Sequence, residues 1–425
     1  MMLVQATKEE IQIKAKIGTK SNGFLYLATN GDGDDVILRT ISDTAGMGLF
    51  RNLHCLIASK MPHTSLLWPQ IVEKDGMECG YIVNKIPCTF HNLLDFWCAR
   101  TQFSSFSTRL QAALFITNAI RNLHIHGFCF LSLDGSNIYV EPNSGEVLID
   151  IENITIINSR ESFLGTYRYL APEIDDGGNV NVNSDLYSLA ILLYRLFMLD
   201  HPFEGESIIR IPCLTACIER RKYGREAVFV YDSVNDSNRP NPHIHKNSRL
   251  LWRYTPFSLK QMFQRSLSHD AITNPAARVS AIEWKNLFLQ LRRTLIVCPN
   301  SSKDKDHDFL ADGIVNVCPR CNDRIMVNTV LHFSDNTDFI VTPHKFVYIG
   351  DEMNPIARGV TKVNDNGIKE LGIQNLSDVT WNITTSSGQL IQIFPSNAMP
   401  LINNIQIRFR SDCACRVNVI YDHLT

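Results

Sequence analysis

The sequence predicts an α+β protein made of successive segments: a small sheet-rich lobe, a mainly helical lobe, a cysteine-bracketed segment and a small all-β sandwich. Three observations support this prediction. Short β-like segments fill residues 10–90, helical apolar spacing continues to about Leu295, and two-residue alternation dominates the last hundred residues. At about 100–200 residues per domain, a chain of 425 residues has room for two to four such units.

The first predicted unit covers residues 1–88 and the second covers residues 89–296. In the first, β-like segments such as "FLYLATN" and "DVILRTI" surround one helical candidate near residues 46–60. In the second, apolar residues of the stretch 107–127 recur at i, i+3, i+4 and i+7, and Gly127 ends the pattern. A sheet lobe followed by a helical lobe is therefore expected.

Two smaller units are predicted to follow. Residues 297–325 are polar and bracketed by cysteines, which is typical of a segment held together by a metal rather than by an apolar core. Residues 326–425 alternate in period two, in segments such as "VTWNITT" and "IQIRFR" that are separated by turns. This alternation is typical of an antiparallel sandwich.

Composition excludes some classes of protein. The 43 acidic and 41 basic residues nearly cancel, so we expect no long-range field that attracts nucleic acid or anionic lipid. The amino terminus lacks a signal-peptide pattern, and the longest apolar stretch, residues 187–199, is shorter than the ~20 residues that cross a bilayer. The twelve cysteines are scattered, which suits reduced thiols. We therefore expect a cytoplasmic protein that binds neither nucleic acid nor membrane.

The most specific motif lies in residues 165–205. It contains "APE", which ends at Glu173, followed by "SDLYSL" with Asp185. This stretch resembles the end of the activation segment and the following helix of protein kinases. The resemblance implies that Glu173 pairs with a late arginine, for which Arg278 is the candidate, and that Asp185 braces the backbone of the catalytic loop. The alternative is an unrelated helical protein with an accidental "APE".

A narrower resemblance comes from residues 228–268 and the cysteine segment behind them. Both resemble bacterial Ser/Thr kinases that occur with von Willebrand factor A proteins and metal-dependent phosphatases in tellurite-resistance-associated gene clusters. This resemblance covers most of the chain. It implies a two-lobed protein kinase-like fold, then a zinc ribbon and a forkhead-associated-like β domain. It also implies a role in signalling, with those two kinds of protein as partners.

The nucleotide-binding residues that the resemblance implies are only partly present. The segment "IGTKSNGFLYL" keeps Gly18 and Gly23 with Lys20 between them, as in a phosphate-binding loop, although a plain hairpin turn explains the pattern equally well. Arg39 stands where the family's lysine holds the α- and β-phosphates. It is either a phosphate fork or a surface residue. Residues 43–61 contain no glutamate to pair with it.

The catalytic loop lacks its base. Counting back from Asn137, the family's magnesium-holding asparagine, places Ser132 where the catalytic aspartate belongs. A serine hydroxyl does not accept a proton at neutral pH, and general-base catalysis is worth ~10²–10⁴ in rate. Asp134 is either a weak substitute base or a turn residue beside Gly135. The sequence therefore predicts little phosphoryl transfer.

The residues that hold magnesium in the family are better preserved than the catalytic base. The segment "LIDIEN" places Asp150 at the aspartate of D-F-G, with Glu152 in place of the glycine. Asn137 and Asp150 together offer oxygen ligands for a magnesium ion between nucleotide phosphates. Glu152 either adds a ligand or caps a loop. Binding of ATP and Mg²⁺ without efficient transfer is therefore chemically coherent.

The cysteine segment carries a metal-ligand pattern. Cys298, His307, Cys318 and Cys321 follow the spacing C-x8-H-x10-C-x2-C, and three thiolates with one imidazole form a closed tetrahedral set for structural Zn²⁺. The resemblance to the family's ribbon supports zinc, and a redox or unpaired cysteine cluster is the alternative. A closed set has no open coordination position, so we expect the zinc to serve folding.

Two further segments have alternative interpretations. Residues 371–409 resemble degenerate forkhead-associated domains, which bind phosphothreonine through a serine and an arginine from exposed loops. No such pair can be placed here, so the region is either a phosphopeptide-binding or a packing module. Residues 217–226, "CIERRKYGRE", are basic, which is typical of a solvated helix face.

Three hypotheses for function follow. The first is a pseudokinase that acts as a signalling regulator or scaffold. The second is an active atypical Ser/Thr protein kinase, in which Asp150 and Asn137 hold magnesium and Arg39 holds phosphate. The third is a scaffold without nucleotide binding, which would follow if Lys20 and Arg39 fill the cleft.

Overall fold

The computed structural model divides the chain into two compact units. The first comprises Met1–Gln102, Phe115–Pro142 and Glu146–Lys285, and the second comprises Phe103–Leu114, Asn143–Gly145 and Asn286–Thr425. The structure describes residues 2–20, 23–41, 46–59, 65–130, 133–159, 167–298, 308–311, 315–318, 320–327, 329–363 and 369–419. Within these ranges, no helix is long and apolar enough to cross a membrane.

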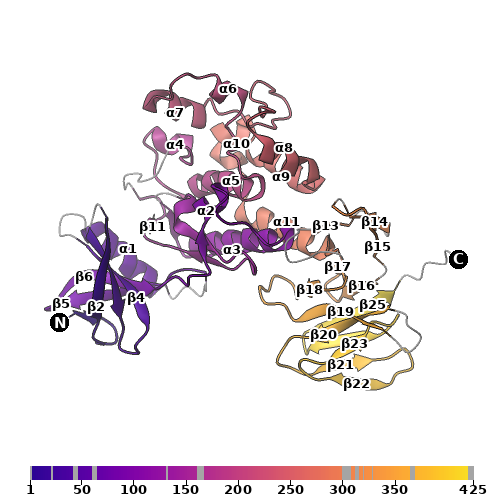
Figure 1. The fold of residues 1–425 in the computed structure, drawn as a ribbon. Helices are drawn as coiled ribbons and strands as arrows, with labels where there is room; N and C mark the ends of the chain where they lie inside the picture. Colours follow the sequence, from indigo (N-terminus) through magenta and orange to yellow (C-terminus); the bar gives the residue numbers. More distant parts are fainter. Residues whose placement is uncertain are drawn as a thin grey trace. The chain divides into compact units, whose positions relative to one another are not determined.

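A six-stranded antiparallel sheet and one helix open the first unit (Figure 1). In spatial order the strands are β1 (Met2–Val4), β5 (Gln70–Lys74), β6 (Met77–Asn84), β4 (Asp35–Thr40), β3 (Gly23–Thr29) and β2 (Gln12–Lys20), and the helix is α1 (Gly46–Ala58). Successive side chains of a strand point to opposite faces. Leu38 and Ile82 accordingly join one apolar cluster, while Tyr81 and Val83 join another that includes Leu53 of α1.

The helical part of the first unit is organised around α5 (Val182–Met198). A capping box starts this helix: the Asn181 side chain accepts from backbone N–H groups, and the Ser184 hydroxyl accepts from the Asn181 backbone N–H. Tyr194 packs edge-on against Phe229 and Phe263, each with ring centroids 5.3 Å apart. The other helices are α2 (Leu93–Trp97), α3 (Phe106–Ile125), α4 (Pro172–Asp175), α6 (Glu206–Ile209), α7 (Ala216–Tyr223), α8 (Lys246–Tyr254), α9 (Phe257–Ser266), α10 (His269–Thr273) and α11 (Ala281–Thr294).

Short strands between α3 and α4 bring two loops together. They are β8 (Phe128–Phe130), β9 (Ile138–Val140), β10 (Val147–Ile149) and β11 (Ile154–Ile156), with the 3₁₀ turn η1 (Gly135–Asn137) between β8 and β9. Strand β7 (His91–Asn92) precedes α2, and the 3₁₀ turn η2 (Pro275–Ala277) precedes α11. β9 pairs with β10 and β8 pairs with β11. The Asp150 backbone N–H consequently donates to the Asn137 carbonyl at 2.8 Å. This pairing places the two predicted magnesium ligands on adjacent loops.

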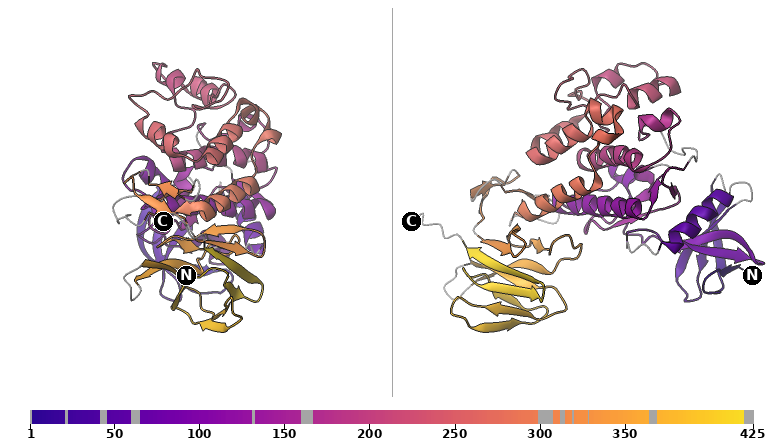
Figure 2. Two further views of the ribbon diagram at one scale, coloured as in Figure 1. Left: turned by 90° about the vertical axis from the view of Figure 1, so that its right-hand side faces the viewer. Right: turned by 180° about the vertical axis from the view of Figure 1, so that it is seen from behind.

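The second unit is strand-rich. One antiparallel sheet has the order β17 (Asp338–Ile340), β16 (Thr329–Phe333), β25 (Cys413–Val419), β24 (Gln406–Arg410), β21 (Trp381–Thr384) and β22 (Leu390–Ile393). The other has the order β18 (Phe346–Val347), β19 (Ala357–Val363), β20 (Lys369–Asn375) and β23 (Ala398–Pro400). Trp381 and Ile407 from the first sheet and Ile373 from the second belong to one buried core. The yellow strands of this unit lie next to one another in Figure 2. Two small pairs precede them: β12 (Leu295–Ile296) with β13 (Phe309–Leu310), and β14 (Val315–Val317) with β15 (Arg324–Met326).

The end of α11 is held within the second unit by buried cations. The Arg292 guanidinium donates to the carbonyls of Glu352 at 3.1 Å and Gly350 at 3.2 Å. Lys345 donates to the Arg293 carbonyl at 2.7 Å. Burial lowers the pKa of Arg292 to about 10 and places the pKa of Lys345 well below its ordinary value. These contacts explain why the last turns of α11 belong to the strand-rich unit.

The mixed helix and sheet content expected from the sequence is confirmed. The helix predicted from the periodicity of residues 107–127 is α3, and Gly127 lies just after its end with φ 86°. Glycine adopts that left-handed conformation without the penalty other residues pay. The bounds of the four predicted domains stay predictions.

Candidate functional site

Arg39 lies at the centre of the predicted nucleotide site. Its guanidinium is buried and donates to both carboxylate oxygens of Asp150, at 2.9 and 2.5 Å. Strand pairing places Arg39 opposite Tyr81 of β6, whose hydroxyl accepts from Nη1 at 3.2 Å. Burial raises the pKa of Tyr81 to about 12, which keeps the phenol protonated. Arg39 is therefore an internal ion-pair partner and not a surface residue.

Glu152 completes the ion-pair cluster. Its Oε2 accepts from Arg39 Nη1 at 3.1 Å, and its backbone N–H donates to Asp150 Oδ1 at 3.1 Å. Burial opposes the charged form of Arg39, but the electrostatic influence of Tyr81 and Asp150 outweighs it and raises the pKa of the guanidinium. The Arg39 guanidinium thus pairs with two carboxylates, those of Asp150 and Glu152. The sequence left the partner of Arg39 open, and the structure supplies it.

This geometry bears directly on magnesium binding. Mg²⁺ is held by oxygen ligands at about 2.0–2.1 Å in near-octahedral geometry. Both Asp150 oxygens already accept hydrogen bonds from Arg39, so the guanidinium occupies the space in front of the carboxylate. A divalent cation at Asp150 would have to displace Arg39. In this arrangement the Arg39 guanidinium, and not a metal ion, neutralises the charge of the Asp150 carboxylate.

The rest of the catalytic loop is described in part. Ser132 lies outside the described residues. The Asp134 carboxylate caps the 3₁₀ turn η1 by accepting from the Ser136 backbone N–H at 2.8 Å, which corresponds to its interpretation as a turn residue. Asn137 ends this turn and is buried. The described residues therefore place Asp134 in a structural role.

The backbone before the loop is braced from α5. The Phe130 backbone N–H donates to the Asp185 carboxylate, at 3.0 Å to Oδ2 and 3.2 Å to Oδ1. His124 Nε2 also lies 2.9 Å from Asp185 Oδ2. Burial raises the pKa of Asp185. This is the contact that the kinase resemblance implies for the aspartate of "SDLYSL".

The glycines of the predicted phosphate loop have a packing explanation. Gly18 and Gly23 lie on the antiparallel strands β2 and β3. A Cβ atom at Gly23 would lie 1.8 Å from the Thr40 carbonyl oxygen, so no other residue fits there. The side chain of Lys20 lies outside the described residues. The geometry around Gly23 accords with the hairpin interpretation.

An aromatic residue that sequence reasoning missed covers the catalytic loop. The ring of Trp97, at the end of α2, packs so closely on Gly135 that a Cβ there would lie 2.1 Å from Trp97 Cη2. The Arg195 guanidinium lies 3.8 Å from the Trp97 ring centroid, and Tyr169 stacks beside it at 6.4 Å. No spacing rule in the sequence links Trp97 to Gly135, because α2 and η1 are brought together by tertiary packing.

Glu173 and Arg278 form a bidentate ion pair. The two guanidinium nitrogens Nη1 and Nη2 donate to the two carboxylate oxygens at 2.6 and 2.7 Å. Arg278 also donates to the carbonyls of Asn183 and Ala271, at 2.7 and 3.0 Å. One side chain therefore joins α4, α5 and α10. These are the two residues that the sequence paired through the kinase resemblance.

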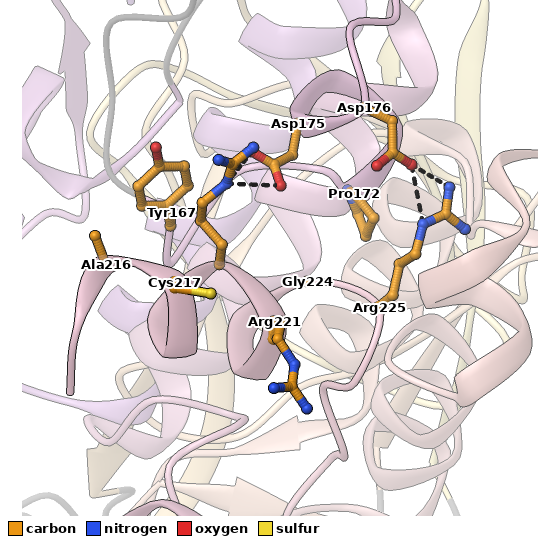
Figure 3. Close-up of a pocket in the computed structure, with 10 residues that line it drawn as sticks. Tyr167, Pro172, Asp175, Asp176, Ala216, Cys217, Arg221, Gly224 and Arg225 are labelled. Atoms are coloured by element: carbon orange, nitrogen blue, oxygen red, sulfur yellow. Dashed lines mark hydrogen bonds and ion pairs between the residues drawn. The ribbon is translucent and has the colours of Figure 1, made fainter. Parts of the chain in front are cut away.

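A separate pocket of about 420 Å³ lies between α4 and α7 (Figure 3). Its walls carry the basic segment 217–226, and the arginines there are already paired. Arg220 Nε donates to Asp175 at 2.8 Å, and Arg225 Nε donates to Asp176 at 2.9 Å. Figure 3 shows Asp176 facing Arg225, with their interaction marked. Arg221 and Lys222 pair with Glu226 of the same segment, so each cation of this basic segment has an anionic partner.

Three of the four predicted metal ligands lie together. The ligand sulfurs of Cys298, Cys318 and Cys321 all lie within 4.8 Å of one another, with 3.6 Å between the sulfurs of Cys298 and Cys321. Tetrahedral Zn²⁺ with Zn–S bonds of about 2.3 Å holds its sulfurs ~3.8 Å apart. A hydrogen bond from the Asp323 backbone lowers the pKa of Cys321. The thiol geometry fits a zinc ion, and His307 lies outside the described residues.

The C-terminal region brings a serine and an arginine to one pocket. A cavity of about 380 Å³ is lined by residues that include Ser377, in a loop, and Arg410, at the end of β24. Both are engaged: Arg410 donates to Glu352 at 2.5 Å, and the Ser377 hydroxyl accepts from Trp381 Nε1 at 3.1 Å. The sequence did not pair these residues because they are more than thirty positions apart. Their present partners favour a packing role.

Comparison with known families defines the class of the first unit. Residues 81–247 match the family described as "Protein kinase domain", which is about two fifths of the chain. The matched segment includes Asp150, Glu173 and Asp185 and leaves Arg39 outside. A protein kinase domain is therefore present.

Individual relatives are protein kinases of bacteria and other organisms. The DNA damage-responsive serine/threonine-protein kinase RqkA of Deinococcus radiodurans is 32% identical over 104 residues, which is 23% of this chain and 16% of the relative. The probable serine/threonine-protein kinase PknB of Lactococcus lactis is 31% identical over 102 residues, again 23% and 16%. Cysteine-rich receptor-like protein kinase 10 of Arabidopsis thaliana is 24% identical over 204 residues, 45% of this chain and 30% of the relative. The matches span between about a sixth and a third of these relatives.

Proposed function

We propose that this protein is a pseudokinase: a kinase-domain protein that acts as a signalling regulator or scaffold without efficient phosphoryl transfer. The observation that carries the proposal is the buried bidentate pair between Arg39 and Asp150. In an active kinase the corresponding aspartate holds magnesium and the corresponding basic residue holds nucleotide phosphate. Here the two residues neutralise each other. Together with a serine in the place of the base, this removes two of the parts that the reaction needs.

The same ion pair predicts how magnesium affects nucleotide binding at this site. Asp150 and Glu152 both accept from Arg39, so ATP that enters this site meets no carboxylate free to share a magnesium ion with it. Nucleotide binding, where it occurs, then gains little from Mg²⁺. In an ordinary kinase, by contrast, the metal ion bridges the protein and the nucleotide phosphates, so nucleotide binding depends on it.

The test compares thermal melting of the full chain with ATP, with ATP plus Mg²⁺, and with ATP plus a chelator. We expect the three melting temperatures to agree, because a ligand raises the melting temperature only when it binds the folded state. In Arg39→Lys the shorter cation cannot hold both Asp150 oxygens, so a Mg²⁺-dependent rise should appear. Arg100→Ala, which removes an exposed arginine, is the matched control.

Phosphoryl transfer is measured in parallel with radiolabelled ATP and a generic protein substrate. We expect the transfer rate of the parent chain to equal that of Asp150→Asn. If the parent chain transfers phosphate at ordinary turnover rates and Asp150→Asn does not, the proposal is wrong. That outcome would support the active atypical Ser/Thr kinase, in which ATP and Mg²⁺ displace Arg39 from Asp150.

A separate proposal concerns a metal ion at the cysteine cluster. We propose that Cys298, Cys318, Cys321 and His307 hold one structural Zn²⁺ in a zinc ribbon. The three thiols have the mutual spacing that tetrahedral zinc requires, and the ion would supply a rigid joint to a polar segment. The sulfurs would bind as thiolates, and the hydrogen bond that lowers the pKa of Cys321 favours that form.

The remaining proposals concern the cellular context. The family resemblance supports von Willebrand factor A and metal-dependent phosphatase proteins as partners in a cytoplasmic bacterial signalling complex. It also supports a forkhead-associated-like identity for the C-terminal sheets, as a packing module in view of the engaged Ser377 and Arg410. Co-purification of the full chain with each candidate partner tests the first of these proposals.

A further inference from the structure

Strand β22 ends the six-stranded sheet of the second unit and is strongly apolar. In the described residues it pairs with β21 on one side, and its other side carries the free backbone groups of an edge strand (Figure 1). Leu390 is 74% exposed and Phe394, directly after the strand, is 55% exposed. Large apolar side chains at such an edge form a template for another strand.

The register shows that one of these side chains belongs to an interior face. Ile391 lies opposite Ile383, and Ile393 lies opposite Trp381. Ile383 and Trp381 are fully buried in the core of the second unit, so Ile391 points to the same inner face. Ile391 is nevertheless 40% exposed, because the sheet stops beside it. One further strand would cover it.

Charge distinguishes this edge from two of the other described sheet edges, those at β17 and β2. No charged residue occurs in residues 379–407. By contrast, the opposite edge strand β17 carries the exposed Asp338, and β2 carries Lys14 and Lys16. Edge strands are commonly protected against pairing by charged residues and by proline. β22 lacks a charge of this kind.

Two other edges of the second unit are protected in different ways. β18 is two residues long, and the Arg358 guanidinium lies 5.7 Å from the Phe346 ring centroid. β23 ends in Pro400, which has no backbone N–H to offer a partner strand. Among the described strands at the edges of the two larger sheets of the second unit, β22 is the one without a charge, a proline or a very short length to protect it.

We propose that β22 is a self-association site, at which two copies of this chain pair their β22 strands antiparallel about a two-fold axis. In this pairing Gln392 lies on the axis opposite its counterpart, and Ile391 of one copy lies opposite Ile393 of the other on the inner face. Leu390 lies opposite Phe394 on the outer face. Because the strand is uncharged, a second copy brings no like-charge repulsion, and an isologous contact of this kind closes as a dimer. Pro395 ends the pairing and limits the contact to the strand. The result is one continuous sheet through both second units.

The test measures the molar mass of the full chain by sedimentation equilibrium across micromolar concentrations. We expect a monomer–dimer equilibrium in the parent chain. Leu390→Lys should weaken the dimer at least about tenfold, because it places two charges at the paired edge. Val234→Lys adds the same charge at a site in the first unit that is 93% exposed, and it should leave the equilibrium unchanged.

Folding is checked separately, so that loss of the dimer cannot arise from unfolding. Leu390→Lys should melt at the same temperature as the parent chain at concentrations where both are monomeric. In the parent chain, hydrogen exchange of the amides of residues 390–393 should slow as concentration rises. The proposal would be overturned if the parent chain had the mass of one chain at every concentration. It would also be overturned if Leu390→Lys did not weaken the dimer. Either result would leave β22 as a site for a strand of another protein.

Discussion

At the scale of single residues, the partner of Arg39 decides how the nucleotide site is interpreted. The sequence gives an arginine in the place of a lysine and an aspartate in its usual place. Either could serve a nucleotide on its own. The structure joins them with two hydrogen bonds and adds Glu152 and Tyr81 to the cluster. The meaning of each residue thus depends on a contact across 111 positions of the chain.

The ion pair between Glu173 and Arg278 leads to a stability prediction. Removing one partner of a buried pair leaves an uncompensated charge, which typically costs about 3–5 kcal/mol. Arg278→Ala should reduce the free energy of unfolding by roughly this amount, and Arg278→Lys by less, because lysine keeps the charge but loses the fork. Urea-induced unfolding measures both. Equal stability of Arg278→Ala and the exposed control Arg253→Ala would contradict the assignment.

His201 predicts a pH dependence. Burial lowers the pKa of His201 to about 3, and its ring accepts from the Phe203 N–H at Nδ1 while Nε2 lies 3.1 Å from the Arg168 carbonyl, as in a neutral imidazole. An unfolded histidine titrates near pH ~6.5, so below that pH only the unfolded state takes up the proton. The contribution of His201 to the free energy of unfolding is complete above about pH 6.5. As the pH falls from there toward the folded pKa, this contribution decreases by up to about 1.4 kcal/mol per pH unit.

Urea-induced unfolding between about pH 6.5 and pH 5 tests this sign, over a window in which carboxylates stay largely ionised. The parent chain should lose about 2 kcal/mol across the window. His201→Gln should flatten the slope, whereas the exposed His243→Gln should not. An unchanged slope in His201→Gln would show that another group causes the dependence.

At the scale of elements, the sequence was most informative where one element carries its own signal. The apolar periodicity of residues 107–127 corresponds to α3, and the segment "SDLYSL", expected in the helix after "APE", lies in α5. Pairing between elements could be predicted only where the kinase resemblance implied it, as for Glu173 with Arg278. The contact of Trp97 with Gly135 depends on how α2 packs beside η1, and the exposed edge at β22 depends on the strand order of the sheet. Local spacing does not encode either arrangement.

The cysteine segment gives a prediction at this scale. Purified chain should contain about one zinc ion, and Cys318→Ser should lose it, because three sulfurs that lie within 4.8 Å of one another would be reduced to two. Cys88→Ser, which changes an exposed cysteine outside the cluster, should keep the metal. Atomic absorption after dialysis measures both. Full metal content in Cys318→Ser would remove this residue from the ligand set.

At the scale of the whole molecule, the chain forms two units whose limits differ from simple sequence order. The second unit takes in residues 103–114 and the end of α11 as well as the strand-rich region. Arg292 is central to this arrangement, since it reaches Gln111 at 3.4 Å and the carbonyls of the loop around residue 350. Composition shifts in the sequence mark where the type of structure changes. They do not mark which helix ends pack with the sheets.

Arg292 therefore carries a prediction for this unit. Arg292→Ala leaves buried carbonyls without a donor, and each such loss costs about 1–3 kcal/mol. The unfolding transition of the second unit should move to lower temperature in calorimetry. Arg293→Ala, the next residue on the same helix, should have little effect, since Lys345 binds its backbone carbonyl and not its side chain. Equal shifts in both variants would contradict this role for Arg292.

The amino-acid sequence by itself determined which chemical groups are present and in what order. The kinase motifs around Glu173 and Asp185, the serine at position 132 and the C-x2-C spacing are covalent facts that need no fold to be read. Tertiary structure alone decided that Arg39 meets Asp150 and that Trp97 packs on Gly135. The physical reason is that such contacts arise from the packing of segments far apart in the chain, and residue spacing constrains only near neighbours.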